Sequence, residues 1–215
     1  MKIGILGSGL VGRQLGLGFS SLGYEVMVGS RTPSKLADWQ LEANNENAKI
    51  GTMEETAEFG EVIVLATLWT GTEEAIKTIG GDKFEGKIII DVTNPLDFSK
   101  GAPPKLDATP DNSGAHQIIN WIGKEVKLVK AFNTINAYIM CKPNLEDGSP
   151  DLFISGDSKE AKDFVTDIAT KWGWNSVVDM GGLNATYWIE CFAMIWIHFA
   201  FKNNQWTHAF KILRK

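Results

Sequence analysis

The chain has 215 residues, with 21 Lys and Arg against 26 Asp and Glu, which gives a formal net charge of −5. This length can bury a substantial core, and 44% hydrophobic with 22% charged residues excludes a disordered chain. The acidic balance and the lack of a run of Lys and Arg argue against nucleic acid and against an anionic membrane as partners.

Strand and helix patterns alternate along the N-terminal half. In chain order we expect a strand at Lys2–Leu6, a helix at Leu10–Leu22, a strand at Glu25–Val28, a helix at Ser34–Asn45, a strand at Lys49–Gly51, a strand at Glu61–Ala66, a helix at Thr72–Ile79 and a strand at Lys87–Asp91. The next segment, Thr93–Ala115, holds four prolines and is expected to be a long irregular loop, a kind of segment that is often functional.

The alternation continues to the C-terminus. We expect a helix at Gln117–Gly123, a strand at Val126–Ala131, a strand at Asp151–Ser155, a helix at Asp157–Trp172, a strand at Asn175–Asp179 and a long helix at Leu183–Leu213 with a break near Asn203-Asn204. Such alternation is typical of an α/β fold. We therefore predict one Rossmann-type, doubly wound domain over residues 1–215, with a mostly parallel sheet of about eight strands and a C-terminal helical segment at 183–215.

A glycine-rich turn follows the first predicted strand and opens the first predicted helix. It reads Gly7-Ser8-Gly9-Leu10-Val11-Gly12, which is the GxGxxG pattern in its required context. The first glycine makes the tight turn, the second lets a pyrophosphate approach the backbone, and the third lets helix and strand pack closely. The free N–H groups at the helix N-terminus favour the phosphates. We predict a dinucleotide site at these six residues.

The residues after the second strand indicate which dinucleotide binds. An NAD site usually has Asp or Glu there to hold the ribose 2′-hydroxyl, whereas this chain has Ser30, Arg31 and Thr32, with Lys35 one turn later. A guanidinium can bond two oxygens of a phosphate at once. We therefore predict NADP(H) as the cofactor.

Polar residues follow the other central strands, at the sheet edge where ligands bind. Thr67, Leu68 and Trp69 follow the fourth strand, Asn94 and Pro95 follow the fifth, and Asn133 follows the sixth. Each alone is compatible with ordinary loop chemistry, but their convergence favours a nicotinamide site. We expect Asn133, Pro95 and Trp69 to align the ring for hydride transfer, and we assign no acid–base residue, because no Lys or His stands in these loops. Transfer to a flavin-like ring needs less from the protein than reduction of a ketone does.

The segments GILGSGLVGRQLGLGFSSLGYEVMVGSR, VIVLATLW, DVTNPL and VKAFNTI resemble the NADPH-dependent coenzyme F420 reductase family and the oxidoreductase domain of the STEAP metalloreductases. The resemblance covers nearly the whole chain, and VGSR together with KAFNT is its most specific part. It implies phosphate contacts from Ser8 to Val11, a 2′-phosphate pair at Ser30 and Arg31, and F420 or a flavin as the second ligand. The chain departs from the family at Thr186-Tyr187, where an Ala-Arg pair is usual, and in the Thr93–Ala115 loop.

Three further expectations concern the setting of the protein. Thr186–Phe201 is apolar but contains Glu190 and is too short to span a membrane, so we expect it to pack at a homodimer interface, with packing inside its own domain as the alternative. The two cysteines and the absence of a signal-peptide pattern favour the cytoplasm. The spacing of the three histidines predicts no metal site.

These patterns predict an oxidoreductase that passes a hydride between NADPH and a small-molecule acceptor. Two other functions remain open: an NADP(H)-binding sensor without turnover, and a reductase of metals, imines or carbonyls. Consumption of NADPH with a panel of acceptors distinguishes the three.

Overall fold

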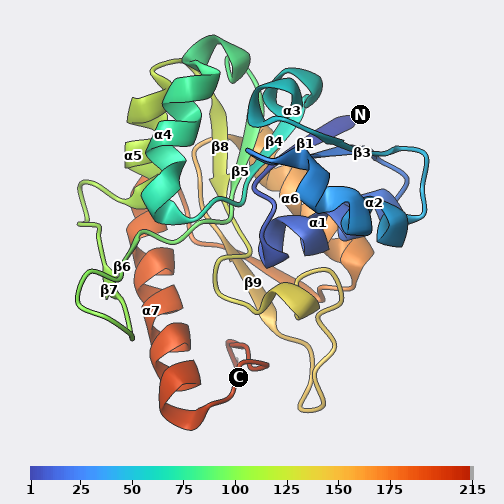
Figure 1. Cartoon of the computed structure of the whole chain (residues 1–215). Helices are drawn as coiled ribbons and strands as arrows, with labels where there is room; N and C mark the ends of the chain where they lie inside the picture. Colours follow the sequence, from blue (N-terminus) through green and yellow to red (C-terminus); the bar gives the residue numbers. More distant parts are fainter. Residues whose placement is uncertain (214–215) are drawn as a thin grey trace.

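A six-stranded parallel sheet forms the centre of the computed structural model, which describes residues 1–213 (Figure 1). In spatial order its strands are β3 (Ala48–Gly51), β2 (Glu25–Gly29), β1 (Lys2–Leu6), β4 (Val62–Leu65), β5 (Ile88–Asp91) and β8 (Lys127–Lys130). The chain steps outward from β1 to β3 and then returns past β1 to β4. In sheets of this kind, ligands bind outside the carboxyl ends of the strands at this reversal.

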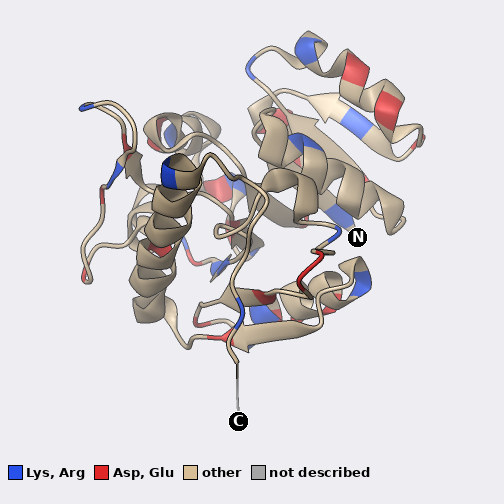
Figure 2. Ribbon diagram, turned by 90° about the horizontal axis from the view of Figure 1, so that it is seen from below, with Lys and Arg blue, Asp and Glu red and all other residues tan. Residues whose placement is uncertain are grey.

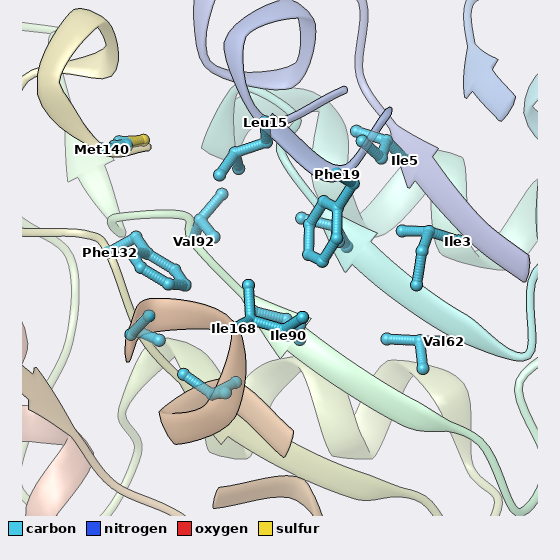
Figure 3. Packing of buried hydrophobic residues seen from close by; sticks show 14 of the residues in the cluster. Ile3, Ile5, Leu15, Phe19, Val62, Ile90, Val92, Phe132, Met140 and Ile168 are labelled. Carbon is cyan, nitrogen blue, oxygen red and sulfur yellow. The ribbon is translucent and has the colours of Figure 1, made fainter. Parts of the chain in front are cut away.

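Helices cover both faces of the sheet, as a doubly wound fold requires. One face carries α1 (Leu10–Ser21), α2 (Ala37–Ala43) and α6 (Lys159–Trp172), and the other carries α3 (Met53–Phe59), α4 (Trp69–Ile79) and α5 (Gly114–Ile122). Alternate residues of each strand serve the two cores: Val62 and Val64 pack into the first, Ile63 and Leu65 into the second. Figure 3 shows the first core, where Phe19 of α1 lies among sheet residues. The predicted parallel α/β fold is confirmed.

The sheet is smaller than the predicted eight strands. β9 (Asp151–Ile154) and β10 (Ser176–Asp179) pair with each other in a separate two-stranded sheet. Their link to the central sheet is an antiparallel bridge between Lys130 and Ser155, the residue after β9, so this segment meets β8 at the end of that strand. Both predicted strands exist, but the central sheet ends at β8.

Two other segments differ from the sequence prediction. The Thr93–Ala115 segment contains a short antiparallel hairpin, β6 (Leu96–Asp97) and β7 (Lys105–Leu106), which lies beside the last helix (Figure 1). Helix α3 was not predicted, although Thr52 and Glu55 form a capping box at its start. Short 3₁₀ turns complete the fold: η1 (Pro33–Leu36), η2 (Gly81–Lys83), η3 (Ala137–Ile139) and η4 (Leu183–Ala185).

The last predicted helix, Leu183–Leu213, ends at its predicted break near Asn203-Asn204, and residues 205–213 do not continue it as a helix. Helix α7 spans Thr186–Asn203 and ends at Asn204, which has a left-handed backbone (φ 50°). The chain then turns back toward β9, where the Asp151 N–H donates to the Phe210 carbonyl at 3.0 Å and the Ile212 N–H donates to Asp151 Oδ2 at 2.8 Å. Among the described residues, no helix has both the length and the hydrophobicity to cross a bilayer.

Candidate functional site

The glycine-rich turn connects β1 to α1 at the carboxyl edge of the sheet. Gly7 has φ +131°, and a Cβ there would lie 2.3 Å from the Ala66 carbonyl oxygen; a Cβ at Gly12 would lie 1.9 Å from the Gly7 carbonyl oxygen. Packing therefore requires both glycines. A Cβ at Gly9 would meet nothing within 4 Å. Packing within the chain does not explain Gly9, whereas a ligand that approaches this backbone does.

The N-terminus of α1 is open to an anion. Its N-cap is Gly9, which offers no side-chain cap, and its first turn has no acidic residue. Leu10 is exposed and Val11 is half-buried. The first N–H groups of this 12-residue helix and the positive end of its dipole are therefore available to a phosphate.

The residues after β2 are joined to this turn. Ser8 Oγ donates a hydrogen bond to Ser30 Oγ at 3.1 Å, and the Thr32 N–H donates to Ser30 Oγ at the same distance. Arg31 and Lys35 are exposed, and Arg31 pairs with no acid among residues 1–213. Among residues 1–213, the structure thus places a cation without an acidic partner next to a buried serine and the glycine-rich turn.

Arg13, which the sequence reasoning missed, braces this region. Its Nε donates to the Ser8 carbonyl at 3.1 Å, its Nη2 donates to the Lys35 carbonyl at 2.7 Å, and its Nη1 pairs with Asp38 Oδ2 at 2.8 Å. The hydrogen bond from Arg13 holds the pKa of Asp38 below its usual value. The guanidinium both compensates the charge of this carboxylate and ties the glycine-rich turn to the segment that carries Lys35.

Two of the residues after β4 have partners within the chain. Thr67 Oγ1 shares a hydrogen bond with Thr72 Oγ1 at 2.8 Å, and the Trp69 ring lies 5.1 Å from the Trp121 ring. Leu68, between them, is 85% exposed. Leu68 therefore offers apolar surface at the edge of the sheet, while Thr67 and Trp69 fix the start of α4.

Asn94 and Asn133 bind each other across the ends of β5 and β8. Asn94 Nδ2 donates to the Asn133 carbonyl, and Asn133 Nδ2 donates to Asn94 Oδ1, both at 2.9 Å. Asn133 is 6% exposed, and its Oδ1 has no hydrogen-bond partner among the described residues. A buried acceptor without a partner is unfavourable, so it points to a missing donor. The N–H₂ of a nicotinamide carboxamide has the required chemistry.

A strained residue holds Asn133 in place. Phe132 has φ +60°, which is costly for a bulky side chain. Its ring is buried 5.5 Å from the ring of Trp172 and 6.3 Å from that of Trp174. The packing of the Phe132 ring stabilises this backbone conformation, at which the chain turns away from the direction of β8 (Lys127–Lys130). Pro95, buried on the facing loop, adds a second rigid residue here.

A cluster of buried charges, also missed by the sequence reasoning, lies next to the asparagine pair. Lys130 Nζ lies 2.6 Å from Asp91 Oδ2 and 3.1 Å from Glu190 Oε1, and none of the three side chains is exposed. Burial alone lowers the pKa of Lys130, but the two carboxylates hold it above its usual value. Burial raises the pKa of Glu190, with Asp91 adding to the rise and Lys130 opposing it.

Two other observations bear on the chemistry of the site. His116 Nδ1 is engaged with Ser113 Oγ at 2.8 Å at the start of α5. Within residues 1–213, no three His, Cys, Asp or Glu side chains come together in a way that could hold a metal ion.

The chain is similar to proteins of one family. The model of the family described as "NADP oxidoreductase coenzyme F420-dependent" matches residues 2–95. The F420-dependent NADP reductase of Methanothermobacter marburgensis is 31% identical over 218 residues, which cover 94% of each chain. A crystal structure from Arthrobacter sp. FB24, assigned provisionally as an F420-dependent NADP reductase, superposes with a TM-score of 0.91 at 33% identity over the whole of both chains.

A longer mammalian protein is also similar. Metalloreductase STEAP3 of Rattus norvegicus is 30% identical over 189 residues, which are 88% of this chain. The match spans 36% of the length of STEAP3, so it concerns about a third of that protein. Together these matches confirm the family resemblance that the sequence motifs indicated.

Proposed function

We propose that this chain, which belongs to the F420-dependent NADP reductase family, transfers a hydride between NADPH and a planar ring acceptor, either coenzyme F420 or a flavin. NADP(H) and coenzyme F420 are the cofactors of this family. The observation that carries the proposal is the buried, unpartnered Oδ1 of Asn133 beside Asn94, at the carboxyl ends of the strands. A carboxamide donor at this position would place the nicotinamide ring at the sheet edge.

The cofactor-binding residues divide into two groups in this proposal. The turn from Gly7 to Gly12 binds the pyrophosphate with backbone N–H groups, and Ser30, Arg31, Thr32 and Lys35 bind the 2′-phosphate. The nicotinamide end is bordered by Thr67, Leu68, Trp69, Asn94, Pro95 and Asn133. The bound nicotinamide supplies or accepts the hydride, and the role of the protein is to align the two rings.

Hydride alignment needs no histidine in this proposal. His116 is already bonded to Ser113, so we expect His116→Ala to lower hydride transfer less than about threefold, whereas the bulky Asn133→Phe lowers it by about 100-fold or more, in line with the cost of misplacing reactants. Loss of transfer in His116→Ala with intact NADPH binding would show that a proton from the protein is required.

The decisive experiment follows NADPH oxidation with coenzyme F420, FMN and riboflavin, and in parallel with ferric citrate, a cyclic imine and a ketone. We expect rapid oxidation with one of the planar rings only. Tight NADPH binding without oxidation by any acceptor would indicate a sensor, and turnover with the second group would indicate a reductase of metals, imines or carbonyls.

The proposal includes a homodimer built on α7. One side of this helix packs in its own chain through Ile189, Ala193 and Trp196, while Trp188, Ile195 and Phe199 share a neighbouring stripe and remain 60%, 57% and 42% exposed. Figure 2 shows α7 almost without charged residues. An apolar groove of about 240 Å³ adjoins it, lined by Phe153, Met180, Trp188, Ile189, Phe192 and Ile212. Exposed apolar surface of this extent fits a subunit contact.

The proposal also covers the domain organisation and the compartment of the protein. We regard residues 1–215 as one NAD(P)-binding domain, because the central sheet, the helices on both of its faces and α7 are all parts of one fold around the same proposed site. The small number of cysteines favours the cytoplasm as the compartment.

A further inference from the structure

The cluster of Asp91, Lys130 and Glu190 is bonded to the same segments that carry the nicotinamide site. Lys130 Nζ donates to the Thr93 carbonyl at 2.8 Å, and Asp91 Oδ1 accepts from the Thr93 N–H at 2.9 Å and from Thr93 Oγ1 at 2.7 Å. Thr93 is followed directly by Asn94. The cluster therefore fixes the residue next to one member of the asparagine pair.

Glu190, the third member of the cluster, contacts the start of α5 and lies next in sequence to a residue that contacts Asn133. Glu190 Oε2 accepts from the Gly114 N–H at 3.1 Å, and Asn133 Nδ2 lies 3.5 Å from the carbonyl of Ile189, the residue before Glu190. The charges thus hold α7 and both ends of the 93–114 segment against Asn133. Asp91, Lys130 and Glu190 are all 0% exposed, so bulk solvent screens the charges of the cluster only weakly.

The cluster has one more acid than base. With all three groups ionised, its net charge is −1, which is unfavourable in a buried setting. Gly114 begins α5, whose positive dipole end lies at the Glu190 carboxylate. Burial and Asp91 nevertheless keep the pKa of Glu190 above its usual value. Glu190 is therefore the group that takes up a proton as the pH falls, and protonation makes the cluster neutral.

Other titratable groups stand on the elements packed against Glu190 but outside the ion-paired set. They are Lys105 on β7, His116 on α5, Asp151 on β9, and Tyr187 and Cys191 on α7 itself. The charges within ion-pair distance of Glu190 and its partner, among the described residues, are Lys130 and Asp91. The charge of this cluster thus depends on a single proton on Glu190.

We infer that the Asp91–Lys130–Glu190 cluster sets the relative affinity of the site for oxidised and reduced cofactor. The inference rests on the proposed function, because it requires the nicotinamide to lie beside Asn133. The oxidised nicotinamide ring carries one positive charge, and the reduced ring carries none. A buried cluster of charge −1 therefore stabilises NADP⁺ relative to NADPH, and the neutral cluster does not. Glu190 acts here as a positioning and electrostatic residue, not as a group that touches the substrate.

The sign of the pH dependence follows from this charge. Above the pKa of Glu190 the cluster is negative and NADP⁺ is favoured; below it the preference is lost. One charge at about 10 Å in an interior of effective dielectric constant about 20 changes an equilibrium by roughly tenfold. Binding of NADP⁺ also releases to solvent the proton that Glu190 carried, whereas binding of NADPH releases none.

The test measures the dissociation constants of NADP⁺ and NADPH by tryptophan fluorescence from about pH 5 to about pH 9. In the wild type, we expect the affinity of NADP⁺ relative to NADPH to rise roughly tenfold across the titration of Glu190. In Glu190→Gln, which keeps an oxygen for the Gly114 N–H, the ratio should stay constant. Glu74→Gln, the same change at an exposed position of α4, should behave as the wild type.

Calorimetry of the wild type in two buffers of different ionisation enthalpy gives an independent measurement, which also decides the matter if Glu190→Gln does not fold. Proton release with NADP⁺ but not with NADPH supports the inference. A pH-independent affinity ratio in the wild type, or equal proton release with both cofactors, would overturn it. Failure of the proposed function has a different signature, namely no oxidation of NADPH by coenzyme F420, FMN or riboflavin.

Discussion

Ser8 and Ser30 are separated by 22 positions in the chain, yet Ser8 Oγ donates a hydrogen bond to Ser30 Oγ at 3.1 Å. In the proposed function, the first belongs to the turn that binds the pyrophosphate and the second to the loop that binds the 2′-phosphate. Because this bond joins the two loops, a cofactor that positions one also positions the other. We therefore expect selectivity for NADP(H) and affinity for any dinucleotide to be properties of one connected unit, with different residues controlling the two.

Arg31 should control selectivity. A charge-assisted hydrogen bond contributes about 1.5–3 kcal/mol, and each 1.4 kcal/mol corresponds to about tenfold in affinity. We expect the wild type to bind NADPH roughly 10- to 100-fold more tightly than NADH, and Arg31→Ala to remove most of this preference while NADH binding stays nearly constant. Since Arg31 is exposed, added salt should also reduce the preference. Titration of both cofactors against both proteins checks this, and equal affinity in the wild type would refute the assignment.

Arg13 should control affinity for both cofactors. Its guanidinium holds the Ser8 and Lys35 carbonyls, and its ion pair with Asp38, which is 73% exposed, contributes little to stability. Arg13→Met should weaken NADPH and NADH alike by roughly three- to tenfold, because one or two backbone contacts that shape the turn are lost. Arg13→Lys keeps the charge but not the planar fork, so it should resemble Arg13→Met. Selective loss of NADPH in these variants would mean that Arg13 contacts the 2′-phosphate directly.

The glycines of the turn should separate folding from binding. A Cβ at Gly12 would collide with the Gly7 carbonyl, so Gly12→Ala should destabilise the fold by about 1–3 kcal/mol despite the better helix propensity of alanine. A Cβ at Gly9 meets nothing, so Gly9→Ala should change stability by less than about 1 kcal/mol and yet weaken NADPH binding. Urea unfolding and cofactor titration of the two variants provide the comparison. If Gly9→Ala bound NADPH normally, the assignment of the pyrophosphate site to this turn would be wrong.

The sequence predicts those features whose signal is local. The strands of the central sheet are short apolar runs such as EVIVLA, and the glycine-rich turn is six contiguous residues, so both are visible in the chain alone. The end of α7 is different. Beyond Asn204 the sequence mixes apolar residues such as Phe210 with polar ones, and only the folded chain shows that the Phe210 ring stacks 4.2 Å from Phe192 after the chain reverses. An apolar pattern does not distinguish a continuing helix from a tail that packs on it.

The buried charges illustrate a second limit. Asp91 ends one strand and Lys130 another, and they become neighbours because the register of β5 and β8 pairs these two residues. Glu190 comes from a helix 60 residues beyond Lys130. The signal that could have found them is the presence of an acid in an otherwise apolar helix, which predicts a buried partner of opposite charge but does not say which one.

The homodimer is tested on the exposed stripe of α7. Ile195 is 57% exposed and lies between Trp188 and Phe199 on this stripe, so a carboxylate there would be buried without a partner in a dimer. We expect the wild type to sediment at twice the mass of one chain at micromolar concentration and Ile195→Glu to sediment as a monomer with an unchanged unfolding transition. Leu41→Glu, at an 80% exposed position of α2, serves as the control and should remain dimeric.

If Ile195→Glu also remains dimeric, the subunits meet elsewhere; if the wild type is a monomer at all concentrations, the stripe has a different role. Because α7 also carries Glu190, a dimer that forms here would stabilise the helix that holds the buried charges, and the monomeric variant should then bind NADP⁺ more weakly than the control does.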